Sequence, residues 1–530
     1  MNHWIVAPVV LPAIAAALLV LLHLPLVGQR ALSLGVTAAL VAIAVGLVMT
    51  AGEGSYGSYA LGNWEAPFGI VMVLDRLSAM MLLLTASIAA WSLLYAVRGS
   101  DAASRHFHAL FQFQLMGLNG AFLTGDLFNL FVFFEVLLIA SYCLLLHGGK
   151  TQQLGPGIHY VAINFAGSFL FLIAVSLLYA MTGTLNMADM ALQVANADPA
   201  DAALIRAGGL LMLVVFAVKA ALLPLYFWLP RAYSAAEAPV AALFSIMTKV
   251  GVYVIVRVYT LIFGPDAGVG ADLATPWLLP VALVTLIVAT LGVMASRTLR
   301  AMVSYLTIAS VGTICVGVGL ASVEAVGAAL FYLLHSTLTI AVLFLISDLI
   351  RRGRGESGDR IERGAAVPQQ GMLGWLFLGA AVAAIGIPPL AGFHGKVLLL
   401  QAAVAHDAAV WVWVAVLANA LLGLVAVAWA GTKVFWQTAE DQPSGPDYPA
   451  VDFVPVLGLM ACIAALAVWA GPVAGYTASA AAQLMQPAGY IRSVLGDAAV
   501  AGLPGRQLAS PLAAQLGGQV IGQPVPGGEQ

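Results

Sequence analysis

Charged residues are scarce in this 530-residue sequence. Lys, Arg, Asp and Glu make up 8% of the chain, whereas soluble domains carry about 25%. Hydrophobic residues make up 62%, and the mean hydropathy is +0.98. This composition excludes an ordinary soluble domain and indicates a chain that lies largely within a membrane.

Cysteines and the usual cofactor-binding motifs are also scarce. The three cysteines, Cys143, Cys315 and Cys462, fall inside apolar runs without ligand spacing, and we interpret them as small buried residues. The sequence has no Walker motif, CxxC, HExxH or His/Cys cluster. These absences disfavour direct ATP drive and metal or haem chemistry, so we expect no cofactor.

Long apolar runs recur along almost the whole chain. Runs of about 18 residues or more are long enough to cross a bilayer as helices, which satisfy their own backbone hydrogen bonds. The alternating pattern of a membrane barrel is absent. We therefore predict an all-α polytopic membrane protein with about fourteen transmembrane helices. They are expected near 4–26, 31–51, 69–97, 106–124, 126–147, 156–182, 205–230, 236–262, 275–295, 299–320, 324–348, 371–404, 409–434 and 453–473.

The charges between these runs alternate in sign. Alternate connections carry Arg30, Arg98, Arg105, Lys150, Arg231, Arg297, Arg300, Arg351, Arg352, Arg354, Arg360, Arg363 and Lys433. The intervening connections are acidic, with Arg206 as the exception. Basic loops face the cytoplasm, so both termini are predicted on the opposite, periplasmic side. Topology explains the arginine cluster at 351–363 more simply than nucleic-acid binding does.

Prolines predict breaks in the seventh and twelfth spans. Pro224 interrupts the seventh span, and Pro388 and Pro389 interrupt the twelfth. Residues 371–404 as one straight helix would measure about 50 Å, well beyond a hydrocarbon core of about 30 Å. Broken helices in corresponding places point to a transport site between internal repeats.

The spacing of the breaks predicts the organisation of the chain. Two five-helix repeats, spans 4–8 and 9–13, would be inverted because five is an odd number. We expect helices 1–3 in residues 1–105, the core in 106–434, and the last helix with a tail in 435–530. From about residue 476 we expect one or two surface helices and then a disordered tail.

Five titratable residues lie in apolar surroundings. Glu135 is near the centre of the fifth span, Lys219 of the seventh, Lys249 of the eighth and His335 of the eleventh. Lys396 follows the break in the twelfth. A charge at the bilayer centre costs roughly 2.5–3.5 kcal/mol on insertion scales, and such residues typically mark ion or proton pathways. The sequence therefore predicts a proton relay at midplane depth.

Lysine suits a switching role in such a relay. A carboxylate about 5 Å from an ammonium stabilises it by roughly 3 kcal/mol at an effective dielectric near 20. When the carboxylate moves or is neutralised, the lysine tends to release its proton, whereas arginine stays charged. The alternative is that Glu135 and the lysines form structural ion pairs, although buried pairs stabilise poorly by themselves. For His335 the alternative is a neutral side chain bonded to a neighbouring helix.

Other charged or polar residues near the ends of spans are given simpler interpretations. Arg257 is interpreted as a structural residue that snorkels to the surface. Glu237 either lines a half-channel mouth or begins the eighth helix. Helix-end or interface roles are expected for Asp75, Arg76, Asp126, Asn129 and Asp348.

Several segments resemble a known family. These are WLPRAYSAAEAPVAALFSIMTKVGVYVIVRVY, FFEVLLIASYCLL, HYVAINFAGSFLFLIAVSLLYAMTGTLNMADMA and FYLLHSTLTIAVLFLISDL. They resemble the antiporter-like subunits of respiratory complex I and of multisubunit Mrp-type (Pha or Mnh) cation/proton antiporters. GTLNMADMA and PAGYIRSVLG are most similar to the D-type branch of the Mrp subunits, and the resemblance covers about residues 60–495.

The resemblance implies fourteen helices with two inverted repeats and assigns relay roles to the same five residues. Lysine at 396 matches the D-type branch, where a complex I subunit has glutamate. Two positions depart from the pattern. Ser310 stands where the tenth span often has histidine or glutamine, and HSTLTIAVLF lacks a lysine that several homologues carry after the histidine. A water could fill either gap.

The expected function is a proton-conducting subunit of a Na⁺(K⁺)/H⁺ antiporter in a bacterial inner membrane. The proton gradient would drive this secondary transport, and the partners would be other membrane subunits, protons, monovalent cations and lipid. One alternative is a proton-pumping subunit of a redox-driven complex, such as complex I or a membrane-bound hydrogenase. Others are a scaffold whose buried charges only pack helices, and a solute permease.

Overall fold

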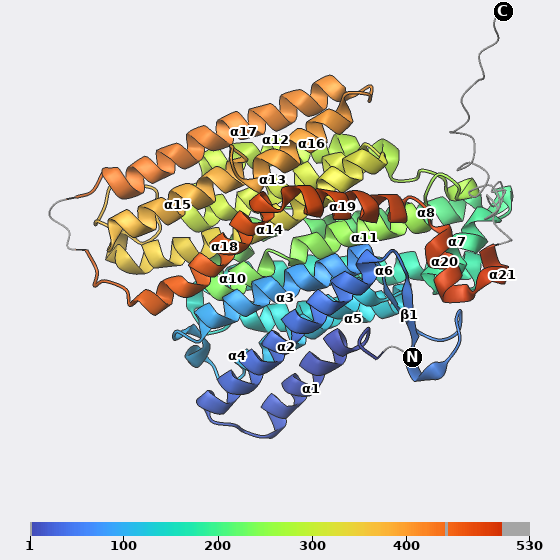
Figure 1. The fold of residues 1–530 in the computed structure, drawn as a ribbon, viewed down its shortest axis with the longest axis horizontal. Coiled ribbons are helices and arrows are strands. Elements are labelled where there is room, and N and C mark those ends of the chain that lie inside the picture. Colours follow the sequence, from blue (N-terminus) through green and yellow to red (C-terminus); the bar gives the residue numbers. More distant parts are fainter. Residues whose placement is uncertain (1–2, 440–443, 501–530) are drawn as a thin grey trace, which may run out of the picture.

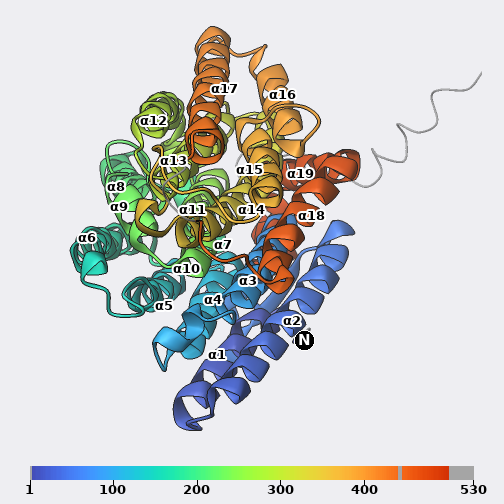
Figure 2. The same cartoon turned by 90° about the vertical axis from the view of Figure 1, so that its left-hand side faces the viewer.

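The structure is a computed structural model that describes residues 3–439 and 444–500. Within these residues the chain forms a helical bundle and one two-stranded hairpin. Most helices run roughly along the long axis of the molecule (Figure 1). The view along that axis shows α11 (Met247–Leu261) and α14 (Val323–Gly353) near the centre (Figure 2).

The N-terminal part contains three helices and the hairpin. These elements are α1 (Ala7–Leu21), α2 (Leu26–Gly52), β1 (Gly57–Ala60), β2 (Val71–Leu74) and α3 (Arg76–Ala96). The strands are antiparallel, and their register runs from Gly57 opposite Leu74 to Ala60 opposite Val71.

The hairpin corrects the predicted third helix, which was expected over 69–97 but begins at Arg76. Residues 71–74 pair with β1 instead. A reciprocal capping box then starts the helix: the Asp75 carboxylate accepts from the Ser78 backbone N–H at 2.8 Å, and the Ser78 hydroxyl accepts from the Asp75 N–H at 2.9 Å. Asp75 therefore has the helix-end role expected for it.

The remaining helices follow with short connections. They are α4 (Phe107–Leu123), α5 (Leu127–Leu145), α6 (Thr151–Thr182), α7 (Met187–Ala195), α8 (Ala202–Ala220), α9 (Trp228–Ala235), α10 (Ala238–Phe244), α11, α12 (Thr275–Ala295), α13 (Leu299–Gly319), α14, α15 (Gln370–Ile385), α16 (Ala391–Ala403), α17 (Ala409–Gly431), α18 (Val454–Val468), α19 (Ala470–Leu484), α20 (Ala488–Leu495) and α21 (Asp497–Val500). A π-turn over Thr432–Trp436 continues α17.

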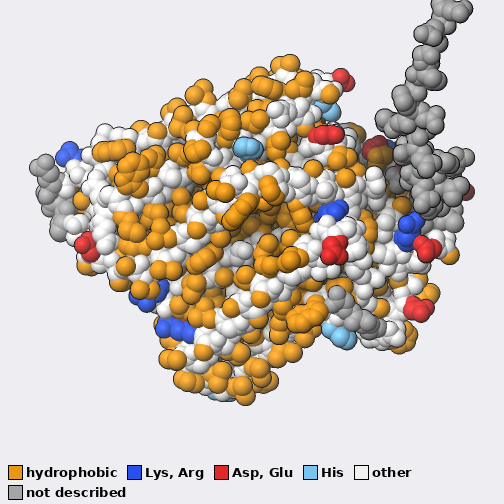
Figure 3. All heavy atoms as spheres, in the orientation of Figure 1, with side chains coloured by type: hydrophobic (Ala, Val, Ile, Leu, Met, Phe, Trp, Pro, Cys, Tyr) orange, Lys and Arg blue, Asp and Glu red, His pale blue; other side chains and the backbone are white. Residues whose placement is uncertain are grey.

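The apolar helices make this a multi-pass membrane protein. In the described part of the chain, eleven helical segments are long and apolar enough to cross a bilayer, one of them α10 and α11 taken together, and α1 and α15 are shorter apolar helices. Hydrophobic side chains cover much of the face in Figure 3, and charged side chains lie mainly toward its two ends. The count of fourteen spans stays a prediction.

Helix α14 lies in the interior of the bundle. In its most apolar window 94% of the residues are buried, compared with 28% for α2 at the periphery. It packs against α13, α16 and α19, and also against α10, α15 and α18. Any side chain placed midway along α14 is therefore screened from lipid on all sides.

The seventh and twelfth spans are interrupted near their prolines. Helix α8 ends at Ala220 and α9 begins at Trp228, while α15 ends at Ile385 and α16 begins at Ala391. Side chains satisfy part of the freed backbone in the first break. The Thr285 hydroxyl accepts from the Leu223 N–H at 3.0 Å, and the Trp228 indole donates to the Val218 carbonyl at 3.1 Å.

A third break, which the sequence did not predict, divides the eighth span. Helix α10 ends at Phe244 and α11 begins at Met247. Neither proline nor glycine lies at 245–246. The Tyr233 hydroxyl donates to the Phe244 carbonyl at 2.8 Å, so a tyrosine from α9 provides a partner for backbone at the interruption.

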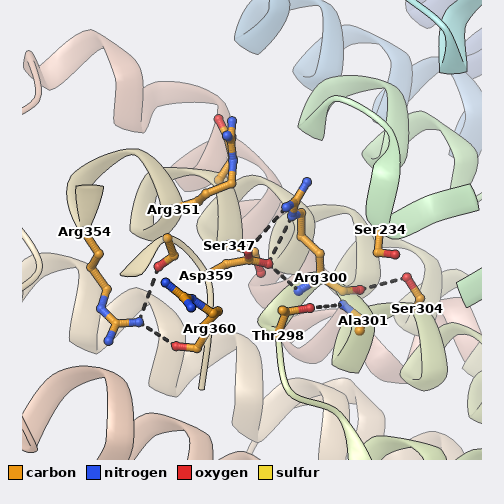
Figure 4. Close-up of polar contacts among 12 residues, drawn as sticks. Ser234, Thr298, Arg300, Ala301, Ser304, Ser347, Arg351, Arg354, Asp359 and Arg360 are labelled. Atoms are coloured by element: carbon orange, nitrogen blue, oxygen red, sulfur yellow. Dashed lines mark hydrogen bonds and ion pairs between the residues drawn. The ribbon is translucent and has the colours of Figure 1, made fainter. Parts of the chain in front are cut away.

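The arginine-rich connection after α14 is folded against the end of the bundle (Figure 4). The Arg300 side chain donates to Asp359 at 3.0 and 3.3 Å. Arg354 is 1% exposed and donates to the carbonyls of Arg360 and Glu362 at 2.7 Å each. These contacts join the start of α13 to the loop that leads to α15.

The segment after residue 469 is helical, and α19 has a buried face as well as exposed residues. A kink at Trp469 joins α18 to α19, which packs against α14 and α3. Ala480 and Ala481 are 0% exposed, and a Cβ at Gly327 would lie 3.1 Å from the Ala478 Cα, so small residues permit this close packing. The predicted disordered tail lies mainly outside the described residues.

Helices α8 and α11 approach each other closely at Gly251. A Cβ there would lie 2.4 Å from the Ala220 nitrogen and 2.7 Å from the Ala220 Cα. Because the obstructing atoms are backbone, a side chain at 251 must push the two helices apart.

We therefore expect Gly251→Ala to lower the stability of the assembled protein by about 1–3 kcal/mol through overpacking. The measurement is thermal unfolding of the purified membrane assembly. Gly46→Ala in α2 is the matched control, because a Cβ there meets nothing within 4 Å. A Gly251→Ala protein that melts like the Gly46→Ala control would contradict this packing.

Candidate functional site

The five predicted relay residues come from five helices. Glu135 lies on α5, Lys219 on α8, Lys249 on α11, His335 on α14 and Lys396 on α16. Glu135 is half-buried, whereas the other four side chains are between 0% and 7% exposed.

Each lysine lies next to a helix break. Lys219 is the penultimate residue of α8, Lys249 is in the first turn of α11, and Lys396 is in the second turn of α16. Breaks leave backbone groups without intrahelical partners. Of the three lysines, Lys396 bonds a backbone carbonyl at its break, that of Ile385.

The direct ion pair between Glu135 and Lys219, which was the structural alternative to a relay, is not present in the described part of the chain. Among the described residues, no salt bridge within 4.0 Å joins them. Instead, the Ser168 hydroxyl on α6 donates to Glu135. The Lys219 ammonium donates to the Asn164 backbone carbonyl and side-chain oxygen at 3.4 Å each.

Helix α6 therefore bridges the carboxylate and the amine. Ser168 also donates to the Asn164 carbonyl at 3.1 Å, so Glu135, Ser168, Asn164 and Lys219 form one continuous chain of contacts. Asn164 and Ser168 were not predicted from the sequence. Their signal was available, because two polar residues four apart lie on one helix face.

A small cavity adjoins both Lys219 and Asn164. It measures about 20 Å³ and lies between α5, α6, Lys219 of α8 and the start of α11. Its lining includes Tyr160, Asn164, Lys219, Met247 and Val250. A space of this size accommodates about one water molecule, and Lys219 and Asn164 provide polar partners.

Lys249 has a direct partner on α13. Its ammonium donates to the Ser310 hydroxyl at 2.8 Å, and Ser310 donates onward to the Thr307 carbonyl at 2.7 Å. The sequence left a gap at Ser310 that a water could fill. The serine itself reaches the lysine, because α11 and α13 pack together at this level.

His335 and Lys396 both contact the last turn of α15. The His335 Nε2 lies 2.9 Å from the Ala383 carbonyl, and the Lys396 ammonium donates to the Ile385 carbonyl at 2.7 Å. Gly392 makes room for the imidazole, because a Cβ there would lie 2.6 Å from Nε2. A positive charge beside the C-terminal carbonyls of a helix is also favourable.

The row continues beyond Lys396 to α17. The Lys396 ammonium lies 3.5 Å from the Asn419 side-chain oxygen. The Asn419 amide donates to Thr290 on α12 at 2.7 Å. Separate groups of polar contacts thus lie between α5 at one side of the bundle and α12 and α17 at another (Figure 2).

Arg257 does not snorkel as the sequence suggested. It is 4% exposed, and its Nη1 lies 2.6 Å from the Asp75 carboxylate. Tyr490 of α20 covers the guanidinium, with its ring centre 5.2 Å from the Arg257 Cζ. The partner, Asp75, lies at the start of α3 and is distant from Arg257 in the sequence. The ion pair therefore keeps the guanidinium buried, which the sequence around Arg257 does not reveal.

The remaining helix-end residues have structural contacts. The Asp126 carboxylate caps α5 by accepting from the Asn129 N–H at 2.7 Å. Asp348 pairs with Arg351 at 2.7 Å, although α14 continues to Gly353 instead of ending there. Glu237 begins α10 and forms an ion pair with Lys150, which leaves the half-channel mouth a prediction.

The arrangement suits the transfer of protons. Three amines, one imidazole and one carboxylate lie within the bundle, and hydroxyl, amide and carbonyl groups connect several of them. Hydroxyl groups donate and accept, and neutral imidazole does so through its two nitrogens.

Comparison with known proteins places the chain in a family. Residues 124–423, which include all five relay residues, match the transmembrane family model described as NADH:quinone oxidoreductase/Mrp antiporter. A probable K⁺/H⁺ antiporter subunit of the D type from Rhizobium meliloti is 40% identical, over 93% of this chain and 98% of the relative. A D-type Na⁺/H⁺ antiporter subunit from Alkalihalophilus pseudofirmus is 36% identical, over 94% and 100%.

The fold is also similar to that of a solved antiporter complex. One polypeptide of the Mrp complex from Dietzia sp. DQ12-45-1b is 28% identical, with a TM-score of 0.84 over 94% of this chain and 100% of that one. The protein therefore belongs to the NADH:quinone oxidoreductase/Mrp antiporter family of membrane subunits, within the D-type branch of its antiporter subunits.

Proposed function

We propose that this chain is the proton-conducting subunit of a multisubunit Na⁺ or K⁺/H⁺ antiporter, driven by the proton gradient. The observation that carries the proposal is the buried row of Glu135, Lys219, Lys249, His335 and Lys396, in which every lysine adjoins a helix break. Relatives named for Na⁺/H⁺ and K⁺/H⁺ exchange support antiport as the coupled process.

Proton transfer begins between α5 and α8 in this proposal. Ser168 and Asn164 of α6 hold Glu135 and Lys219 near one helix face, and the proton passes between the carboxylate and the amine themselves or through a water, because the Asn164 oxygens only accept hydrogen bonds. A charge on Glu135 favours the charged form of Lys219, and its neutralisation favours proton release. The cavity beyond Lys219 has room for a water that leads toward Lys249.

The second half of the row transfers the proton from Lys249 toward Lys396. The Ser310 hydroxyl accepts a hydrogen bond from Lys249. His335 and Lys396 both contact backbone carbonyls in the last turn of α15. The breaks let short helices shift without disturbing the continuous α14. Small displacements at a break can therefore make or release a lysine contact.

The membrane arrangement is part of the same proposal. We infer fourteen spans in a bacterial inner membrane, with two inverted five-helix repeats in the core at 106–434 and both termini on the periplasmic side. Alternating loop charge supports the orientation. Corresponding breaks after α8 and α15 support the repeats. The partners are other membrane subunits, as in the assembly of the similar Dietzia chain.

Replacing Lys219 tests the relay. We expect Lys219→Ala and Lys219→Arg each to lower cation-dependent proton exchange by about 100-fold, because neither side chain can release a proton. The measurement uses vesicles with the intact assembly, an imposed proton gradient and no reductant. Arginine keeps the positive charge. If the charge of Lys219 served only helix packing, Lys219→Arg would therefore retain exchange.

Lys433→Ala is the matched control for this experiment. Lys433 lies in the turn after α17 and donates to Gln437 at 2.7 Å, outside the row. Its replacement should leave exchange at the wild-type rate. Normal exchange by an assembled Lys219→Arg protein would overturn the relay role of Lys219.

Ser310 offers a second test. We expect Ser310→Ala to slow exchange by about tenfold or more, since Lys249 loses a charge-assisted hydrogen bond. Ser310→Thr keeps the hydroxyl and should retain most of the rate. The same vesicle assay measures both variants, and equal rates for alanine and wild type would contradict the role of Ser310.

A further inference from the structure

Two cavities follow one another along helix α3, which packs against α2 and α19 near the front of the view in Figure 1. One is apolar and measures about 430 Å³, and the other is polar and measures about 500 Å³. Both volumes lie in the range of small-molecule sites, which is about 300–1,000 Å³. None of the five relay residues lines either cavity.

The apolar cavity is a groove with α14 at its floor. Its lining is almost wholly apolar and includes Leu84 of α3 and Val473 of α19. Leu334 of α14, the residue before His335, also lines it. Leu334 is the exception to the burial of α14, because every other residue from 325 to 350 is buried. The groove therefore exposes part of the central helix at the depth of a relay residue.

The polar cavity lies where α3 begins, and its lining is basic. Arg76, the first residue of α3, and Arg492 of α20 line it together with the Gln483 side chain, and none of the described lining residues is acidic. Arg492 pairs with Asp497 at 3.1 Å. Arg76 forms no salt bridge within the described part of the chain, and its guanidinium donates to the Gly52 carbonyl at 3.0 Å. Arg76 therefore retains donors and charge for an anion.

The two cavities form one path. Arg76 lines the polar cavity, whereas Met80 and Ser87, on the same face of α3, line the groove. On α19, Tyr476 lines the groove, and Gln483 lines the polar cavity two turns later. The Tyr476 hydroxyl donates to the Arg76 carbonyl at 3.1 Å, so the cavities adjoin at this contact.

The length of the path matches one leaflet of a bilayer. From Arg76 to Ser87, α3 rises about 16 Å at 1.5 Å per residue. Half of a hydrocarbon core of about 30 Å is about 15 Å. Because α3 is long and apolar enough to cross a membrane and Arg76 begins it, the path runs from the bilayer surface toward its middle. A charged head followed by one hydrocarbon chain has this shape.

We propose that this path binds one anionic phospholipid of the surrounding bilayer. Its phosphate accepts hydrogen bonds from Arg76, with Arg492 nearby, and one acyl chain lies in the groove against Leu334. Two guanidinium groups favour a headgroup of net negative charge. The bound chain completes the apolar surroundings of α14 beside His335, and the site does not depend on how protons move along the row.

The test measures the lipid that the purified intact assembly retains. The assembly is incubated in detergent with equal amounts of phosphatidylglycerol and phosphatidylethanolamine, and the lipid bound per assembly is counted by mass spectrometry. We expect Arg76→Gln to weaken phosphatidylglycerol binding by about tenfold or more, because charge-assisted hydrogen bonds are lost. Arg206→Gln is the matched control, since Arg206 is exposed on α8 outside the path, and it should bind like the wild type.

Val473→Trp tests the groove without changing Arg76. The larger side chain occupies the space of the acyl chain, so we expect a similar loss of phosphatidylglycerol. Val414→Trp is its control, because Val414 is 58% exposed on α17 and lies outside the groove. This second pair decides the matter if Arg76→Gln fails to assemble.

Three results would each overturn the inference. The first is wild-type retention of phosphatidylglycerol by either assembled variant, which is also the result expected if a helix of another subunit fills the path. The second is equal retention of phosphatidylethanolamine by the wild type, which would contradict an anionic headgroup. The third is thermal stabilisation by inorganic phosphate as large as that by phosphatidylglycerol, which would indicate a pocket for free anions instead of a lipid site.

Discussion

A lysine ammonium inside a membrane-spanning bundle must find hydrogen-bond acceptors in the protein, because hydrocarbon offers none. The three buried lysines meet this constraint beside helix breaks. Lys219 uses Asn164, Lys249 uses Ser310, and Lys396 uses the carbonyl that ends α15. These acceptors are uncharged, so each lysine keeps the freedom to lose its proton. A tight carboxylate partner would hold the charge in place.

The same breaks connect neighbouring sites mechanically. His335 and Lys396 both contact the last turn of α15, so a shift of that turn changes both contacts at once. Helix α14 stays continuous and buried, and it provides the fixed frame against which the short helices can move. A row of exchangeable groups on movable elements around one rigid helix is an arrangement suited to gated proton transfer.

The sequence identified the residues that are costly to bury but not the groups that satisfy them. Glu135 and the lysines stand out because a charge in an apolar run is costly to bury. Pro224, Pro388 and Pro389 reveal the breaks because proline lacks the N–H that a helix interior requires. Ser168 and Asn164 were missed because burying an uncharged serine or asparagine in an apolar run costs less free energy than burying a charge. The break before Lys249 was missed because neither proline nor glycine lies at 245–246, and the Phe244 carbonyl there finds its partner in Tyr233, a residue of another helix. Arg257 was misplaced because Asp75 is distant in the sequence.

The central claim is that the buried groups change protonation during exchange, and infrared difference spectroscopy tests it most directly. The purified assembly would be switched from rest to turnover by adding the exchanged cation under a proton gradient. Glu135→Gln would assign the signal of the Glu135 carboxyl group. We predict that this carboxyl group gains and loses a proton as exchange proceeds. An ionisation state of Glu135 that stays constant through sustained exchange would contradict the relay.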